Sequence, residues 1–296
     1  MGQGWQWAVT GLWWLVAVVT GCGDACGSAC GAGPEPAHPA LAGLQRPIII
    51  GHGGAKQLCA ANTLACFQRA SDEGARAMEA DLQVLGDGQL VMFHDDNALR
   101  QTGRDVDLRD LDLAGLRALD AGWGFSPDGG LTHPLRGLGL QVPTLEAFLD
   151  AFPDLPVLLD VKPECPEMRA ALLRFVGSPA FAAESRQRVY IKVNDSALAA
   201  ALRDLEPAPR VAFSSTERAE LVMTPAAVAH LEPSWIDLNP PYLTPALVDW
   251  AHDHQHLITA STVDEVTSQE QLLEHLPGLD GIVTNRPDRL RELLQR

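Results

Sequence analysis

Two neighbouring segments of the sequence bring acidic residues and a histidine together. In MEADLQV, Glu79 and Asp81 are two residues apart, so on a β-strand their side chains would point to the same side. The turn LGDG follows, and the segment QLVMFHD then carries His94. Because so short a turn joins only antiparallel strands, we expect a hairpin. Two carboxylates and a histidine that converge in this way are typical of a cation site with an acid or base beside it.

Two other predicted strands end with similar chemistry. In the segment IIIGHGG the predicted strand ends at His52, and the glycines after it would let a ligand approach the backbone. The segment LLDVKPE places Asp160 and Lys162 two residues apart, again on one face of a strand. Lys162 could hold a developing negative charge. Taken alone, Asp160 and Lys162 could be a structural ion pair, and His52 could be a buried core histidine.

The recurrence of such groups at several strand ends favours a functional site over these structural explanations. Oxygen ligands from Glu79, Asp81 and Asp160 suit one divalent cation of the hard type, Ca²⁺ or Mg²⁺, rather than zinc. His52 and His94 could then divide the roles of general base and general acid. These residue types therefore predict metal-assisted acid–base chemistry.

The elements that would position these residues alternate between strand-like and helical segments from Pro47 onward. The strand-like segments are 47–51, 77–84, 89–95, 156–162, 188–193, 210–214, 235–239, 257–262 and 280–285. Setting aside 89–95 as the hairpin strand leaves eight parallel candidates, which is the number that an α/β fold of the TIM (β/α)₈ barrel type requires. We therefore expect such a barrel, with a β-hairpin and a small insertion at its C-terminal face. A doubly wound open sheet is the alternative, but the turn GHGGAKQLCAANT lacks the G-x-G-x-x-G fingerprint.

Composition narrows the classes of partner. With 296 residues and 46% hydrophobic content, the chain can bury the core of one large domain, which we place at 47–296. Its net charge of −16 argues against a nucleic-acid partner and against electrostatic adhesion to an anionic membrane. A small molecule is the expected partner.

The N-terminal region has a different character. Residues 1–22 contain an apolar run of signal-peptide length that ends in Val-Thr-Gly-Cys22, which resembles the lipobox of bacterial lipoproteins. Residues 23–46 are rich in Gly, Ala and Pro and predict a flexible tether. We therefore expect an exported lipoprotein, on the periplasmic or cell-surface side, that meets the membrane only through its N-terminal lipid. A simple signal peptide or an N-terminal anchor is the alternative. In an exported protein two of Cys59, Cys66 and Cys165 could be oxidised, with the pairing left open.

The order of these motifs resembles the glycerophosphodiester phosphodiesterase family, in the phospholipase C-like phosphodiesterase superfamily. The segments that carry the resemblance are GHGG, AANT, MEADLQVLGDGQLVMFHDD, VPTLEAF and the closing GLDGIVTNRPDRLRELL. The likeness covers about residues 47–296, and residues 97–142 fall where the family carries its inserted subdomain. It implies a TIM barrel that uses a divalent metal to hydrolyse a phosphodiester to an alcohol and a phosphomonoester, which is sn-glycerol 3-phosphate in the family.

The resemblance also implies roles for individual residues. It implies metal binding by Glu79, Asp81 and Asp160. It implies that His52 and His94 form the acid–base pair. It also implies that Lys162 and Asn62 bind the substrate or its phosphate.

Four positions depart from the family's usual pattern. Gly53 replaces an arginine, Ala61 a glutamate, Asp160 a glutamate and Ser261 a tryptophan. Activity is still expected, but we expect a preference for diesters whose larger alcohol portion contacts residues 97–142. Two other functions stay open: a superfamily relative that acts on a phospholipid head group, as the sphingomyelinase D-like enzymes do, and a non-catalytic lipoprotein that binds a ligand.

Overall fold

A computed structural model describes residues 41, 43–162, 165–179, 181, 183–193, 196–214 and 234–296. The chain divides into residues 1–35 and residues 36–296, and all of the described residues belong to the second unit. The predicted leader and most of the predicted tether therefore lie outside the described residues. Where the structure is described, none of the helices combines the length and apolar character needed to cross a membrane.

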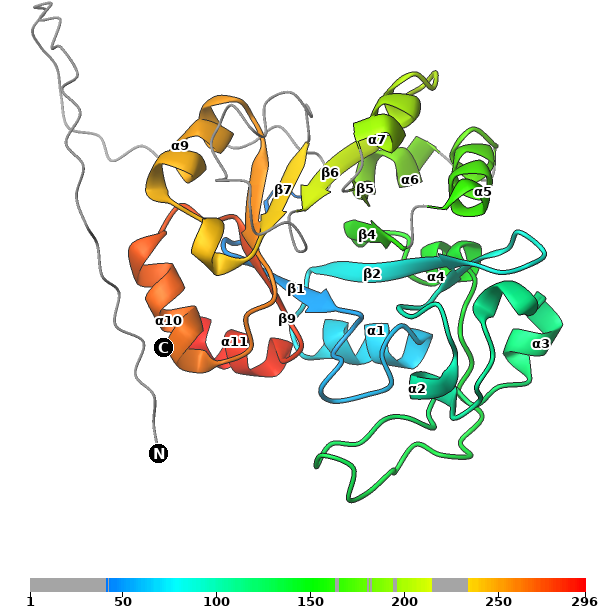
Figure 1. Ribbon diagram of the computed structural model, residues 1–296. Helices are drawn as coiled ribbons and strands as arrows, with labels where there is room; N and C mark the ends of the chain where they lie inside the picture. Colours follow the sequence, from blue (N-terminus) through cyan, green and yellow to red (C-terminus); the bar gives the residue numbers. More distant parts are fainter. Residues whose placement is uncertain are drawn as a thin grey trace, which may run out of the picture. The chain divides into compact units, whose positions relative to one another are not determined.

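A closed barrel of eight parallel strands forms the centre of the described part of the chain (Figure 1). In spatial order the strands are β1 (Ile48–His52), β2 (Ala77–Val84), β4 (Val157–Val161), β5 (Val189–Val193), β6 (Arg210–Ser214), β7 (Trp235–Leu238), β8 (Leu257–Ala260) and β9 (Gly281–Thr284). Pairing between β1 and β2 closes the ring. The ninth strand, β3 (Leu90–Met92), pairs antiparallel with β2. The predicted barrel and hairpin are thus confirmed.

In the described residues, helices follow most of the barrel strands and cover the outside of the barrel (Figure 1). They are α1 (Leu64–Asp72), α4 (Leu145–Ala151), α5 (Pro166–Val176), α6 (Ala183–Arg188), α7 (Ser196–Arg203), α9 (Pro245–Asp253), α10 (Val266–His275) and α11 (Pro287–Leu294). Threonines begin three of them by accepting a hydrogen bond from a backbone N–H of the first turn: Thr63, Thr144 and Thr244. Phe67 of α1 and Phe148 of α4 pack with their ring centroids 4.4 Å apart, within the apolar layer between helices and strands.

The barrel interior changes from apolar to charged along the strands. Apolar side chains fill its lower part, including Ile48, Ile50, Leu158, Tyr190, Trp235 and Leu257. Because strand side chains alternate between the two faces, the next inward positions toward the C-terminal ends are two residues further on. These positions hold His52, Asp160, Lys192, Asp237 and Thr259. The polar groups therefore gather at the C-terminal end, where barrels of this type place their active sites.

Residues 97–142 form the insertion, with the short helices α2 (Leu99–Thr102), η2 (Leu108–Asp110) and α3 (Leu113–Arg117). Its small core joins Leu108 and Leu116 to Val91 and Phe93 of the hairpin segment. The insertion is thereby anchored on the strand pair that carries the acids.

Candidate active site

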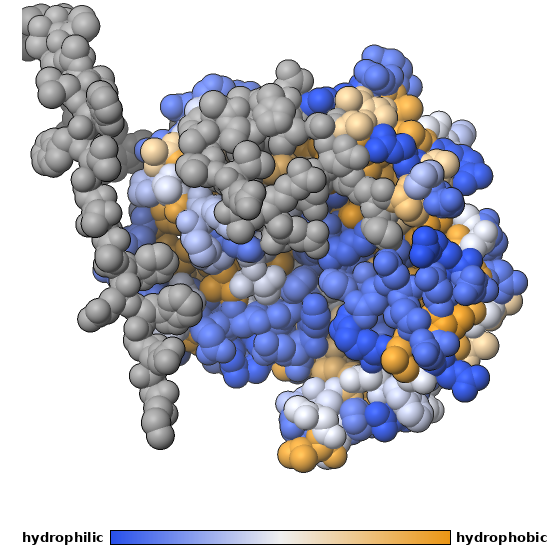
Figure 2. Space-filling view, viewed as in Figure 1, coloured by the Kyte–Doolittle hydropathy of each residue, from blue (hydrophilic) through white to orange (hydrophobic). Residues whose placement is uncertain are grey.

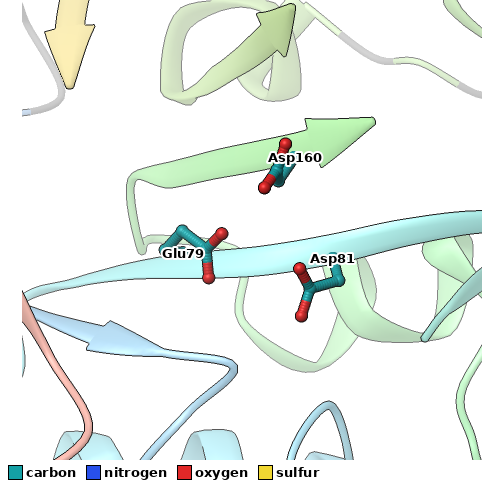
Figure 3. A group of neighbouring side chains, drawn as sticks. All are labelled: Glu79, Asp81 and Asp160. Carbon is teal, nitrogen blue, oxygen red and sulfur yellow. The ribbon is translucent and has the colours of Figure 1, made fainter. Parts of the chain in front are cut away.

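Three buried carboxylates stand together on adjacent strands (Figure 3). Glu79 and Asp81 project from β2, and Asp160 projects from β4, where it is the register partner of Asp81. One oxygen from each residue lies within 4.8 Å of an oxygen of each of the others. Three acids this close repel one another strongly unless positive charge lies between or beside them.

Two lysines supply part of that positive charge. Lys162 Nζ lies 2.8 Å from Asp81 Oδ1 and 3.1 Å from Asp160 Oδ2. Lys192 Nζ approaches from β5, at 3.1 Å from Asp160 Oδ2 and 3.4 Å from Glu79 Oε1. The acids are therefore arranged around two ammonium groups rather than exposed to solvent.

Sequence reasoning missed Lys192 and a fourth acid, Asp237 of β7. Asp237 Oδ2 lies 3.7 Å from Lys192 Nζ, and its Oδ1 accepts a 2.8 Å hydrogen bond from Thr259 Oγ1. Both side chains are almost fully buried. The available signal was a single charge inside an otherwise apolar strand, in VYIKV and in WIDL, since an isolated buried charge is costly and needs a reason.

The pKa values reflect this crowding. Burial, and then repulsion from Asp81, raise the pKa of Glu79 to about 7. Burial also acts to raise the pKa of Asp81, but the ammonium of Lys162 and the two histidines outweigh it and hold that pKa below its usual range. Asp81 Oδ1 is buried and lies beside the ammonium of Lys162. Three buried carboxylates that each offer an oxygen to one small space suit a hard cation, so Glu79, Asp81 and Asp160 fit Ca²⁺ or Mg²⁺.

His52 lies at the end of β1, beside Glu79, which is its register partner on β2. Its Nε2 is 3.7 Å from Glu79 Oε2, and its Nδ1 is 3.4 Å from Thr262 Oγ1. Burial, followed by the nearby charge of Lys56, lowers the pKa of His52 to about 4. The neutral imidazole that results can accept a proton.

His94 has a different environment. Its Nδ1 lies 2.7 Å from Asp95 Oδ1, so the carboxylate accepts a hydrogen bond from the ring. Asp95 is held in turn by Arg100 of α2, whose Nε and Nη2 donate at 2.5 and 2.8 Å. Burial acts to raise the pKa of Asp95, but these hydrogen bonds outweigh it and lower that pKa. Arg100 and Asp95 therefore fix the orientation of the His94 ring.

Asn62 holds one of the acids in place. Its Nδ2 donates a 2.7 Å hydrogen bond to Asp81 Oδ2, and its Oδ1 accepts a hydrogen bond of 3.2 Å from the backbone N–H of Asp81. Asn62 has a φ of 58°, a conformation that asparagine tolerates better than most residues. A disulfide between Cys59 and Cys66 closes the loop around it, while Cys165 is a free thiol. The pairing that the sequence left open is thereby resolved.

Two adjacent cavities contain the seven residues predicted from the sequence. A cavity of about 270 Å³ at the mouth of the barrel is lined by Glu79, Asp160, Lys162, His52 and His94, together with Lys192. Asp81 and Asn62 line a second cavity of about 230 Å³, which also reaches His94. A larger surface hollow of about 550 Å³ beside α5 has neither histidine nor lysine among its described lining residues, so we do not place chemistry there.

Comparison with known proteins gives a consistent result. The model of the glycerophosphoryl diester phosphodiesterase family matches residues 52–289. A glycerophosphodiester phosphodiesterase from Caldanaerobacter subterraneus is 26% identical over 85% of this chain and 99% of its own length. Among solved structures, a candidate glycerophosphoryl diester phosphodiesterase from Silicibacter pomeroyi is 26% identical, with a TM-score of 0.73 over 86% of this chain and 97% of the other. A phosphodiesterase from Oleispira antarctica, in complex with the product sn-glycerol-3-phosphate, shares the fold at 22% identity and a TM-score of 0.68, over 84% of this chain and 97% of the other.

Proposed function

Because the chain belongs to the glycerophosphoryl diester phosphodiesterase family and is a hydrolase of phosphoric diesters, we propose that it cleaves glycerophosphodiesters to an alcohol and sn-glycerol 3-phosphate, with one divalent cation, Ca²⁺ or Mg²⁺. The observation that carries this proposal is the convergence of two histidines and the acids of β2 and β4 on neighbouring cavities at one end of the barrel. A module that only binds a ligand would need no such acid–base pair.

The acids Glu79, Asp81 and Asp160 would hold the cation, since each offers an oxygen to a common centre. When bound, the cation would supply positive charge to the phosphoryl oxygens. Lys162 lies at the same mouth and would share that role as a fixed positive charge. Asn62 would serve the substrate site by holding Asp81, to which both ends of its amide are hydrogen-bonded.

The two histidines would perform complementary proton transfers. The glycerol portion of such a substrate has a hydroxyl next to the ester oxygen, and His52 in its neutral form would accept the proton of that hydroxyl as its oxygen attacks phosphorus. His94, oriented by Asp95, would donate a proton to the departing alcohol oxygen. Water would then open the resulting cyclic phosphate, with the histidines in reversed roles. In each step one histidine gains a proton and the other loses one, so the second step restores both histidines to their starting state.

A substrate panel tests the proposal. Purified protein is incubated with glycerophosphodiesters and with a lysophospholipid, in Mg²⁺, in Ca²⁺ and in chelator, and the products are identified by ³¹P NMR. We expect sn-glycerol 3-phosphate from the glycerophosphodiesters, only in the presence of a cation. Release of a phosphorylated alcohol instead would show that the other ester bond is cleaved, and the absence of any hydrolysis would refute the assignment. Arg117→Gln, at an exposed position of α3 outside both cavities, serves as a control variant.

We also propose that the protein is exported and attached to the membrane through a lipid on Cys22. The lipobox-like sequence supports export, and so does the Cys59–Cys66 disulfide, because disulfides persist mainly in oxidising compartments. Fractionation of cells that express the whole chain tests this idea. The wild type should sediment with membranes and Cys22→Ser should not; a soluble cytoplasmic protein with an intact Met1 would contradict it.

A further inference from the structure

The second cavity lies beside the first and shares His94 with it. One wall is the loop after β1, which contributes Lys56 and Ala61, and the opposite wall is the insertion, which contributes Gln101 and Phe125. Gln101 Nε2 donates a 2.9 Å hydrogen bond to the carbonyl of Ala61, so the two walls are tied together. This hydrogen bond holds the loop and the insertion together beside the cavity.

Two small residues lie at or beside this space. A Cβ atom added at Gly53 would lie 3.4 Å from the Cβ of Ala61 and 3.6 Å from Nδ2 of Asn62. A side chain at Gly53 would therefore meet Ala61, and these are two of the positions at which this chain departs from the family's usual arginine and glutamate. Ala61 lines the cavity, so a larger side chain there would take up part of the space. Its volume of about 230 Å³ is below the range of roughly 300–1,000 Å³ that holds a drug-sized ligand, so it suits an alcohol head group.

The location of His94 indicates which part of the substrate would enter. If His94 protonates the departing alcohol, as the proposed function requires, that oxygen must lie next to its ring. The ring faces both cavities. With the phosphate held beside Lys162 in the first cavity, the departing alcohol would extend into the second.

The charges around the second cavity favour some alcohols over others. No carboxylate of the described residues pairs with Lys56, which leaves its ammonium available to the cavity. Asp81 is the acid in the described lining, and it is paired with Lys162. Phe125 and the exposed Arg100, which is paired with Asp95, complete the wall, so the described lining has one Phe, Tyr or Trp ring and no free acid, unlike the aromatic cages that bind quaternary ammonium groups. Hydrophilic residues also dominate the face between the barrel and the insertion (Figure 2).

We propose that this second cavity receives the departing alcohol and selects alcohols without positive charge, namely polyols and anionic alcohols, against cationic amino alcohols. This inference rests on the proposed function, and it adds the substrate class. Lys56 is its specificity-determining residue: its ammonium repels a cationic head group and donates hydrogen bonds to hydroxyl or acidic oxygens. A charge at this position affects the choice between substrates more than the chemistry that they share.

The test compares kcat/KM for sn-glycero-3-phosphoinositol and sn-glycero-3-phosphocholine, in wild type, Lys56→Gln and Lys56→Glu. We expect the wild type to prefer the inositol diester by about tenfold or more, and Lys56→Glu to lower that ratio by roughly tenfold through charge reversal, with Lys56→Gln between them. Arg117→Glu makes the same change in net charge outside both cavities and should leave the ratio unchanged.

The outcomes separate this inference from the proposed function. Equal kcat/KM for both diesters in the wild type, or a ratio that Lys56→Glu does not move, would overturn the substrate class while leaving glycerophosphodiester hydrolysis established. Hydrolysis of neither diester in the presence of cation would overturn the proposed function, and this inference with it.

Discussion

The barrel has a buried ionic cluster at each end, and the two clusters are built differently. At the N-terminal end, Asp280 precedes β9, and both of its oxygens have partners. Oδ1 accepts from Arg46, and Oδ2 accepts from the backbone N–H of Ile258 at 2.8 Å and from His252 Nε2 at 3.3 Å. At the C-terminal end, the described residues bring four carboxylates around two lysines, which leaves two negative charges uncompensated by residues of the cluster.

We interpret the lower cluster as a stabilising element of the fold and the upper cluster as the functional site. Asp280 has three hydrogen-bond donors among the described residues, whereas four carboxylates of the upper cluster face two ammonium groups, and we propose that a cation completes that cluster. With all four acids ionised the excess is two negative charges, which one divalent cation would balance. The pKa values agree with this contrast. At the lower end the hydrogen bond to Asp280 raises the pKa of His252, its cationic partner. At the upper end burial and the neighbouring acid Asp81 raise the pKa of the acid Glu79.

The largest expected effect is the loss of activity in Asp81→Asn. The change removes one proposed ligand but keeps its size, so kcat/KM should fall on the order of 10³-fold or more, and divalent-ion affinity should fall with it. Without cation, the free energy of unfolding should also fall, because Lys162 and the histidines outweigh burial and hold the pKa of Asp81 low, so that its charge stabilises the folded protein. Steady-state kinetics and denaturant unfolding in chelator check both points, and unchanged kcat/KM would remove Asp81 from the site.

The next effect concerns the two histidines. His52→Ala and His94→Ala should each lower kcat by roughly two to four orders of magnitude, since each removes one proton transfer. The wild-type pH profile should be bell-shaped, as an acid–base pair requires, and activity should be lost at low pH as His52 gains a proton. A variant that raises KM alone would show that its histidine binds substrate and does not transfer protons.

Asp280→Asn should lower stability without lowering activity, unlike Asp81→Asn. Removal of the buried charge leaves Arg46 and His252 without their acid, so the free energy of unfolding should fall by about 2–4 kcal/mol. kcat/KM should stay within twofold of wild type, because Asp280 lines neither cavity. If Asp280→Asn impaired catalysis at full stability, the division of roles between the two ends would be wrong.

The smallest effect is the pH dependence of cation binding. Glu79 has a pKa of about 7 without cation, so a proton competes with the cation below that pH. Affinity should fall as pH falls, by about tenfold for each pH unit below 7. The pKa of Asp81 lies too low to contribute in this range. Calorimetric titrations at pH 5, 6, 7 and 8 measure the slope, and Glu79→Gln should flatten it.

The sequence predicted the barrel and most of the site because both depend on local patterns. Alternating apolar strands and the two-residue spacing of Glu79 and Asp81 are visible in one dimension, and each strand was found within two or three residues at either end. Lys192 and Asp237 were missed because only closure of the barrel brings β5 and β7 near β2. The contact between Gly53 and Ala61 likewise depends on how one loop folds back on itself.

The central claim is that the upper cluster becomes an active site by binding one cation. The most direct measurement is the rate of glycerophosphodiester hydrolysis by metal-stripped protein while Ca²⁺ or Mg²⁺ is added back, with bound cation counted in the same titration. The account predicts a rate near zero that rises in proportion to occupancy and levels off at one equivalent per chain. Full activity in the metal-stripped protein would contradict it and would leave Glu79, Asp81 and Asp160 without the role proposed for them.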